Sequence, residues 1–287
     1  MKERGRNMKV RCLLLSTCVS LCLLQGCSQK AEEESILAAE KEAAEVSKKA
    51  PEEVMKPLDL SAFERKPVQW GEQVDGVKTR MKTDEKKMAL TFDACGGAHG
   101  SGYDEELLSF LRAEQVPATL FLNERWIQAN KALFLELAAD PLFQIENHGT
   151  EHAPLSVAGG EAWGIEATAS PQAVYDEIMS NHQTVKALTG KEMTMFRSGT
   201  AYYDEVAVQL AEELGYQVVN FDVLGDAGAT FSSAQVKQAL ISAKEGAIAL
   251  LHMNQPQSGT AEGVKQAVPV LREQGYEFVL LGNETLE

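Results

Sequence analysis

Short apolar runs alternate with amphipathic stretches from residue 67 to the end of the chain. The apolar runs have the length of β-strands and lie at 87–93, 117–122, 142–148, 193–199, 216–222, 247–253 and 276–281. Helical periodicity is found between them, near residues 103–114, 125–139, 171–189, 203–214, 233–244 and 261–274. Strands that alternate with helices are typical of a parallel sheet. The pattern predicts an α/β fold, in which the strands either close as a barrel or form an open doubly wound sheet.

Residues 27–66 lack this alternation. The stretch 31–57 is rich in Ala, Glu and Lys, contains no aromatic residue and has too few apolar residues to bury a face. This composition is typical of a helical spacer or of a disordered segment. We therefore expect an acidic tether at 27–66 and a folded domain at 67–287.

The first 26 residues have the pattern of an export signal. Residues 1–11 are basic, and residues 12–24 form an apolar run that is short for a membrane span. The sequence "LLQGCS" that follows resembles the lipobox of bacterial lipoproteins, in which the Cys becomes the first mature residue and carries the lipid. The resemblance implies a lipoprotein signal peptide at 1–26, a lipid on Cys27 and attachment to a membrane of the cell envelope on its periplasmic side. An ordinary cleaved signal and an uncleaved anchor are the alternatives, and Ser28 favours the outer membrane in a Gram-negative cell.

Charge and cysteine content narrow the possible functions. The formal net charge is −15, which argues against a nucleic-acid partner because phosphate backbones attract cationic surfaces. Cys95 is the one cysteine beyond residue 27, so the domain is not a disulfide scaffold.

Reactive side chains fall at the C-terminal ends of the apolar runs. Asp93 ends the first run, His148 the third and Asp222 the fifth. Arg197 and His252 lie near the ends of the fourth and the sixth. Because parallel strands gather their carboxyl ends at one edge, these side chains should converge on one mouth. This convergence predicts an enzyme.

The stretch "ENHGTEH" places His148 and His152 four residues apart. This spacing lets two imidazoles face one metal ion, although the spacing alone is a weak signal. Arg197 follows two apolar residues, so its stem is expected to be partly buried. A buried guanidinium needs an acid partner, for which Asp93 is the obvious candidate.

Taken in order, "TFD", "HxxxH", "FR", an Asp after an apolar strand and "LLH" resemble the motifs of the polysaccharide deacetylases, carbohydrate esterase family 4. The resemblance covers roughly residues 85 to 285. It implies a distorted (β/α)7 barrel, which agrees with the strand pattern. It also implies metal-assisted removal of acetyl groups from a sugar polymer.

Carried over by position, the resemblance implies that Asp93 is the base that takes the proton of the attacking water. His148 and His152 match the two imidazoles that bind the metal, and Arg197 matches the arginine that orients the base. The implied cofactor is a divalent metal, often Zn²⁺, which lowers the pKa of bound water and polarises the acetyl carbonyl.

The acid side of the reaction is implied in the same way. His252 matches the general acid, with Asp226 as the group that raises its pKa and Asp222 as a rival for that role. The N–H of Thr200 falls where the family has an oxyanion donor, and Leu250 is expected in the pocket floor. Four aromatic residues are candidates for stacking on sugar rings: Trp126, Trp163, Tyr202 and Tyr203.

One position departs from the family pattern. The family usually has a second Asp directly after the first, which binds the metal, whereas this chain has Ala94. Three interpretations stay open. Asp93 binds the metal and leaves the base role to Asp222, Cys95 supplies a thiolate, or two histidines and water hold the ion weakly. We expect Asp93 to lie near the metal, and a buried structural thiol is the other interpretation of Cys95.

The sequence thus predicts a lipid-anchored hydrolase that deacetylates an envelope polysaccharide, with N-acetylglucosamine units of peptidoglycan as the nearest substrate. The competing interpretation, which Ala94 keeps open, is a catalytically weak or inactive member that binds glycan. A metal hydrolase acting on a small amide is a third possibility. The long glycine-rich connection at 154–171 is expected to form a lid or a groove wall.

Overall fold

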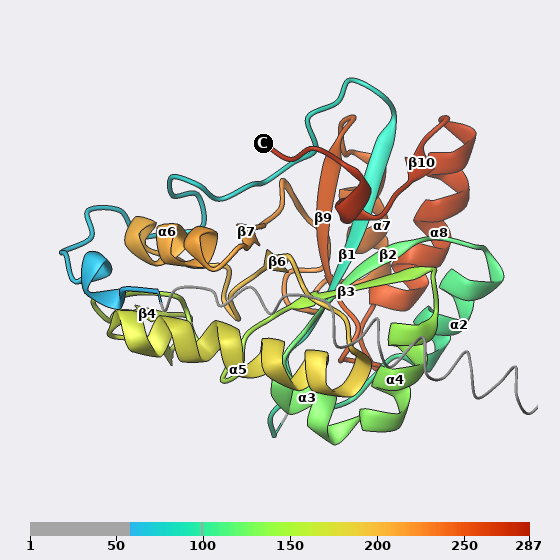
Figure 1. The fold of residues 1–287 in the computed structure, drawn as a ribbon. Coiled ribbons are helices and arrows are strands. Elements are labelled where there is room, and N and C mark those ends of the chain that lie inside the picture. The colour runs from blue at the N-terminus through green and yellow to red at the C-terminus, as the bar shows by residue number, and fades with distance from the viewer. Residues whose placement is uncertain (1–57, 99) are drawn as a thin grey trace, which may run out of the picture. The chain divides into compact units, whose positions relative to one another are not determined.

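The structure is a computed structural model that describes residues 58–98 and 100–287 (Figure 1). The predicted signal peptide at 1–26, the lipidation of Cys27 and most of the predicted tether lie outside the described residues. Within the described part of the chain, the helices lack the combination of length and apolar character needed to cross a membrane.

The strands form one parallel sheet around which the rest of the fold is built. Its order is β7-β6-β3-β2-β1-β9-β8, and β10 pairs with the start of β1. The strands are β1 (Lys87–Ala94), β2 (Ala118–Leu122), β3 (Phe143–Asn147), β6 (Met195–Phe196), β7 (Gln217–Val218), β8 (Val223–Leu224), β9 (Ala247–His252) and β10 (Glu277–Phe278). The long central strands β1, β2 and β9 are almost fully buried, as expected for a sheet covered on both faces.

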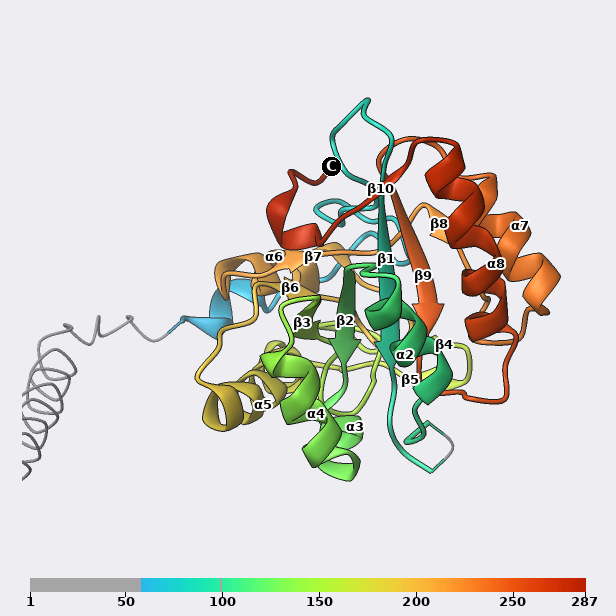
Figure 2. The same ribbon diagram turned by 90° about the vertical axis from the view of Figure 1, so that its right-hand side faces the viewer.

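The two outer strands of this sheet lie near each other. β7 ends at Val218 and β8 begins at Val223, and five residues span at most about 18 Å. The sheet must therefore curl until its edges approach, as Figure 2 shows. Isolated bridges from Lys78 to Val219 and from Arg80 to Ala247 fill part of the gap. The predicted distorted barrel is confirmed, and the open doubly wound sheet is excluded.

The helices surround the curled sheet (Figure 2). They are α2 (Glu105–Ala113), α3 (Glu124–Ala129), α4 (Lys131–Ala139), α5 (Pro171–Thr189), α6 (Glu205–Glu213), α7 (Ser233–Ile241) and α8 (Thr260–Glu273). The helix expected at 125–139 is two helices, because the chain leaves the helical conformation at Asn130. Polar side chains cap the starts, as Ser170 does for α5 and Asp204 for α6.

Some of the residues just before 67, where we expect the folded domain to begin, have regular structure. A short 3-10 helix, Leu60–Phe63, packs against α5 and α6 and buries Phe63. This contact gives residues just before 67 a place in the core. A second 3-10 helix, Leu281–Asn283, follows β10.

The glycine-rich connection contains a small hairpin. Its strands are β4 (Glu161–Ala162) and β5 (Ile165–Glu166), with an exposed Trp163 at the turn. Trp163 and Gly164 both have positive φ, of 56° and 78°, which produces the tight reversal. The hairpin brings the Trp163 ring to the mouth of the barrel, where it lines a pocket.

Candidate active site

Asp93 and Arg197 form a buried ion pair at the centre of the site. Asp93 lies near the end of β1, and Arg197 directly follows β6. Arg197 Nη1 donates to Asp93 Oδ1 at 2.8 Å and to Thr91 Oγ1 at 2.9 Å. The guanidinium carbon also lies 4.1 Å from the centre of the Phe121 ring. Arg197 therefore has the acid partner that its buried position requires.

This pair sets the charge state of Asp93. Burial alone raises the pKa of its carboxyl, but the positive charges of Arg197, His148 and His252 outweigh burial and hold the pKa below its usual value. The carboxylate is therefore ionised at neutral pH and can accept a proton.

A backbone carbonyl orients the buried ring of His148. The Nδ1–H of His148 donates to the carbonyl oxygen of Arg197 at 3.0 Å. Because a carbonyl only accepts, the proton of the neutral ring is on Nδ1, and Nε2 keeps a free lone pair. Nε2 lies 3.6 Å from Asp93 Oδ2 and 3.8 Å from Cys95 Sγ.

His152 reaches the same place through an unusual loop conformation. Its backbone has a φ of 65°. Glu177 of α5 accepts hydrogen bonds from the N–H groups of the two residues that flank His152, at 2.9 and 3.2 Å. At Gly199 a Cβ would lie 2.3 Å from His152 Cγ, so only glycine leaves room for the ring. The His148 and His152 ring centres are 5.0 Å apart and the rings are nearly perpendicular.

Cys95 joins the two histidines in a cluster that could hold a metal ion. One ligand atom from each residue lies within 4.8 Å of the other two. The Nε2 atom of His152 is buried and has no hydrogen-bond partner among the described residues. Sulfur and imidazole nitrogen are donors that divalent transition metals accept. The residues present therefore fit the divalent metal that the family resemblance implies.

The thiol of Cys95 lies among imidazoles that favour its ionised form. Burial raises the pKa of its thiol, but the neighbouring imidazoles of His152 and His148 outweigh burial and hold the pKa well below its usual value.

His252 faces the cluster from β9, whose register pairs it with Asp93 on β1. Its Nδ1 lies 2.8 Å from Asp226 Oδ1, and its backbone N–H donates to Asp226 Oδ2. Burial lowers the pKa of His252, but the adjacent Asp226 carboxylate raises it well above its usual value. Asp222, the rival partner, instead accepts from the N–H of Ile248. The structure therefore pairs His252 with Asp226.

A pocket of about 580 Å³ opens over these groups. Asp93 and His252 lie in its wall together with Thr200 and Leu250. The Oγ1 of Thr200 is buried without a partner, and no hydrogen bond from its N–H is found within the described part of the chain. Trp163 borders the pocket from the hairpin. The volume is within the range of small-molecule sites.

An aromatic ridge made of Trp70, Tyr202 and Trp163 continues from this pocket. The ring centre of Tyr202 lies 5.8 Å from that of Trp70 and 5.9 Å from that of Trp163. Trp163 and Trp70 are 74% and 40% exposed, so their faces are open to a ligand. By contrast, Trp126 and Tyr203 are fully buried and cannot stack on a sugar.

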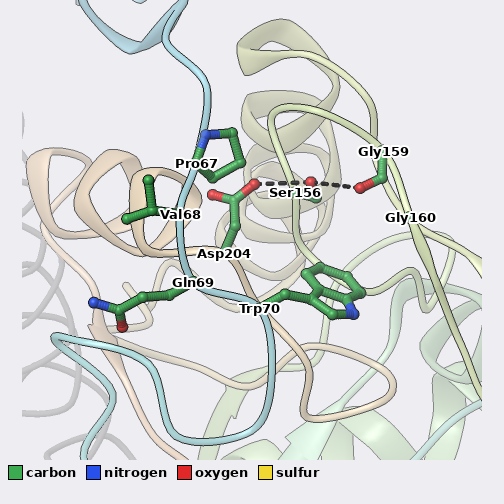
Figure 3. A pocket seen from close by; sticks show the side chains of 8 residues that line it. All are labelled: Pro67, Val68, Gln69, Trp70, Ser156, Gly159, Gly160 and Asp204. Carbon is green, nitrogen blue, oxygen red and sulfur yellow. Dashed lines mark hydrogen bonds between the residues drawn. The ribbon is translucent and has the colours of Figure 1, made fainter.

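A second, shallower hollow lies beside Trp70 (Figure 3). Ser156 Oγ lies 2.8 Å from Asp204 Oδ2 and 2.9 Å from the carbonyl oxygen of Gly159. Asp204 also accepts from the N–H of Val157 and caps α6. These hydrogen bonds hold the start of the hairpin connection against the barrel. Because Ser156 and Asp204 are engaged in them, we assign the hollow no chemical role.

Glu177 was not singled out by the sequence. It is a single acid on the buried face of α5, and nothing in its neighbourhood along the chain links it to His152. Burial raises its pKa to about 7. Its Oε1 lies so close to Gly149 that a Cβ there would be only 2.2 Å away. The glycine after His148 is therefore the one sign in the sequence that another group packs at this position.

Comparison with known proteins agrees with this fold. Residues 80–219 match the family model of polysaccharide deacetylase. A peptidoglycan-N-acetylglucosamine deacetylase of Listeria monocytogenes is 28% identical over 197 residues, which are 68% of this chain. The matched part is only 38% of the relative, so this chain spans about two fifths of its length.

Two solved structures share the architecture. A family 4 carbohydrate esterase of Bacillus subtilis has a TM-score of 0.61 at 25% identity, over 73% of this chain and 84% of that chain. A CE4 family pseudoenzyme of Bacillus anthracis has a TM-score of 0.59 at 23% identity, over 70% and 66%. The family match includes β1, which carries Asp93, and the residues His148 and Arg197, which directly follow β3 and β6, and it ends before β9. Residues 80–219 of this chain belong to the polysaccharide deacetylase family, and the fold of the described residues agrees with that membership.

Proposed function

We propose that this protein is a metal-dependent hydrolase that removes acetyl groups from a cell-envelope polysaccharide, with N-acetylglucosamine units of peptidoglycan as its substrate. The observation that carries the proposal is one pocket wall that contains both Asp93, which is paired with Arg197, and His252, which is paired with Asp226. The name of the Listeria monocytogenes relative supports peptidoglycan as the polymer.

In this proposal, Asp93 is the general base. It takes a proton from the attacking water while the water oxygen forms a bond to the acetyl carbon. Arg197 keeps the carboxylate ionised and prevents it from rotating. A divalent cation, for which we favour Zn²⁺, would be held by His148 and His152 and would supply Lewis acidity that activates water and polarises the carbonyl.

Charge that develops on the carbonyl oxygen needs a donor. Thr200 lines the pocket, and its N–H, which has no hydrogen-bond acceptor among the described residues, would be that donor. His252 then gives its proton to the sugar nitrogen as the carbon–nitrogen bond breaks, so the products are acetate and a free amine. The Asp226 carboxylate stabilises the protonated imidazole before that transfer. Leu250 packs beneath the acetyl group, and Tyr202 with Trp163 offers stacking faces to neighbouring sugars.

The experiment is acetate release by the purified protein from peptidoglycan, from chito-oligosaccharides and from a short N-acetylated amide. We expect release from the glycans and none from the small amide. Asp93→Asn should abolish turnover, and His252→Ala should slow turnover while metal content stays unchanged. Release from the small amide alone would refute a polysaccharide substrate.

A second candidate is a catalytically weak or inactive envelope protein that binds glycan. Ala94 at the position of the usual metal carboxylate favours it, and one protein with the same fold is described as a pseudoenzyme. Glycan binding without acetate release, in protein with verified metal content, would support this candidate over the enzyme.

We also propose that the protein is attached to the periplasmic side of an envelope membrane through a lipid on Cys27, because its N-terminal sequence resembles a lipobox. Metabolic labelling with a palmitate analogue should mark the protein, and Cys27→Ser should abolish the label. Labelling that survives this substitution would refute the anchor.

A further inference from the structure

We propose that Cys95 is the third protein ligand of the metal in the deacetylase site proposed above, replacing the carboxylate that the family places at residue 94, and that Asp93 is thereby left free as the base. The ligand set would be one thiolate and two imidazoles, and this set takes a divalent transition ion such as Zn²⁺.

The direction of the backbone explains why the ligand lies at 95. Side chains alternate between the two faces of a strand, so Ala94 points away from the side that carries Asp93, and residue 95 returns to it. Ala94 is fully buried in the main hydrophobic cluster of the domain. A carboxylate at residue 94 would therefore enter apolar packing, unless the loop took another course.

The loop that follows has little freedom to take another course. Gly96 has a φ of 70°, and a Cβ there would lie 2.6 Å from the backbone nitrogen of Trp126 in α3. This contact fits the turn tightly against the start of α3. Cys95 is thus held by β1 on one side and by this turn on the other.

The sulfur of Cys95 and the Nε2 atoms of His148 and His152 lie close together, and contacts within the protein do not account for all three positions. The proton on His148 Nδ1 leaves Nε2 with a lone pair that points toward Cys95 Sγ, 3.8 Å away. Among the described residues, the buried Nε2 of His152 has no hydrogen-bond partner, although burying an unpaired polar atom is costly. A cation between the sulfur and the two nitrogens would satisfy the orphaned atom.

Asp93 is placed differently from this group. Arg197 donates a hydrogen bond to Oδ1 of Asp93, and Oδ2 lies 3.6 Å from His148 Nε2. Within the described residues, the group whose donor atoms lie mutually close consists of Cys95, His148 and His152, and Asp93 is not part of it.

The first test measures the metal environment directly and needs no catalysis. The full chain is prepared with serine at its four N-terminal cysteines, Cys12, Cys18, Cys22 and Cys27, so that Cys95 is its one thiol. X-ray absorption of the zinc form should show one sulfur at about 2.3 Å beside nitrogen or oxygen at about 2.0 Å. The cobalt form should show a thiolate-to-metal charge-transfer band. A shell of nitrogen and oxygen alone would overturn the proposal.

A matched pair of variants tests the position of the ligand. Cys95→Asp keeps Ala94 and places a carboxylate where the thiolate was, whereas Ala94→Asp with Cys95→Ala places the same carboxylate one residue earlier. Only the first should bind the metal with affinity near that of the parent. Cys95→Ser should weaken binding by more than about 100-fold, beyond what the loss of an outer contact costs. Tighter binding by the second variant would overturn the proposal.

Asp93→Asn separates the ligand role from the base role. It should retain metal content and the cobalt band while acetate release is lost, and each variant is checked by circular dichroism for folding. Loss of metal in Asp93→Asn with retention in Cys95→Ser would reverse the assignment. A sulfur-ligated metal without acetate release from any glycan would leave this inference standing and would refute the proposed enzyme. Acetate release by a protein whose metal has only oxygen and nitrogen ligands would refute this inference and would leave the proposed enzyme standing.

Discussion

Replacement of Arg197 by methionine tests whether the buried ion pair is the centre of the site. The arginine is fully buried, and its guanidinium donates to Asp93, to Thr91 and to two backbone carbonyls. Methionine has a comparable length and preserves contact with the Phe121 ring, so little volume is lost. The change therefore removes charge and hydrogen bonds far more than packing.

The size of the effect follows from what remains behind. Without Arg197, the Asp93 carboxylate stays buried without its closest counter-charge, and breaking a buried pair in this way costs about 3–5 kcal/mol. For a domain of this size each kcal/mol lowers the melting temperature by about 2–4 °C. A loss of about 4 kcal/mol thus predicts a melting temperature lower by roughly 8–16 °C.

Thermal and denaturant unfolding of metal-free protein would measure this loss, in a cycle with Asp93→Asn. The double variant should be more stable than Arg197→Met alone, because it contains no unpaired carboxylate, and the coupling energy should be about 2 kcal/mol or more. A loss below about 1 kcal/mol for Arg197→Met, or additive losses in the double variant, would refute the reasoning.

Three further outcomes are expected. Asp226→Asn should lower the pKa of His252, which must be protonated to act as the acid, so the alkaline fall of kcat should begin at a lower pH; an unchanged pH profile would contradict this. Gly149→Ala should destabilise the protein to chemical denaturation by more than Gly164→Ala, because both positions have positive φ but only the first Cβ would collide with Glu177; equal losses would contradict the geometry. Chelation should abolish acetate release and lower the melting temperature, and added Zn²⁺ should restore both, since a ligand bound only to the folded state stabilises it.

The fold could be predicted from the sequence because burial of both faces of a parallel sheet leaves a strong pattern. Each of the apolar runs contains strand residues, from 87–93, which lies in β1, to 276–281, which contains β10. The ends of the short strands were harder to predict. In the run 193–199, only Met195–Phe196 has strand conformation. Beyond Phe196 the chain turns inward to place Arg197, and a propensity scale contains no information on that turn.

The site could be predicted in part for the same reason. Parallel strands bring their carboxyl ends together, and this rule is enough to associate Asp93, His148, Arg197 and His252. The choice between Asp222 and Asp226 was left open by the sequence, because Asp222 ends the same apolar run that Asp226 closely follows. The difference comes from register: β8 pairs with β9, so the chain passes along His252 only after Leu224.

At the third metal ligand, comparison with the family motif and the geometry of the strand lead to different conclusions. Alignment of motifs compares residue 94 with the family's carboxylate and finds alanine, which suggests a damaged site. Strand alternation instead assigns Ala94 to the apolar face and Cys95 to the face of Asp93, and the structure places its sulfur beside His148. A ligand displaced by one residue changes the donor from hard oxygen to soft sulfur, which favours Zn²⁺ over harder cations. Because Cys95 completes the proposed metal site without a carboxylate at residue 94, the alanine at that position is no evidence of lost activity.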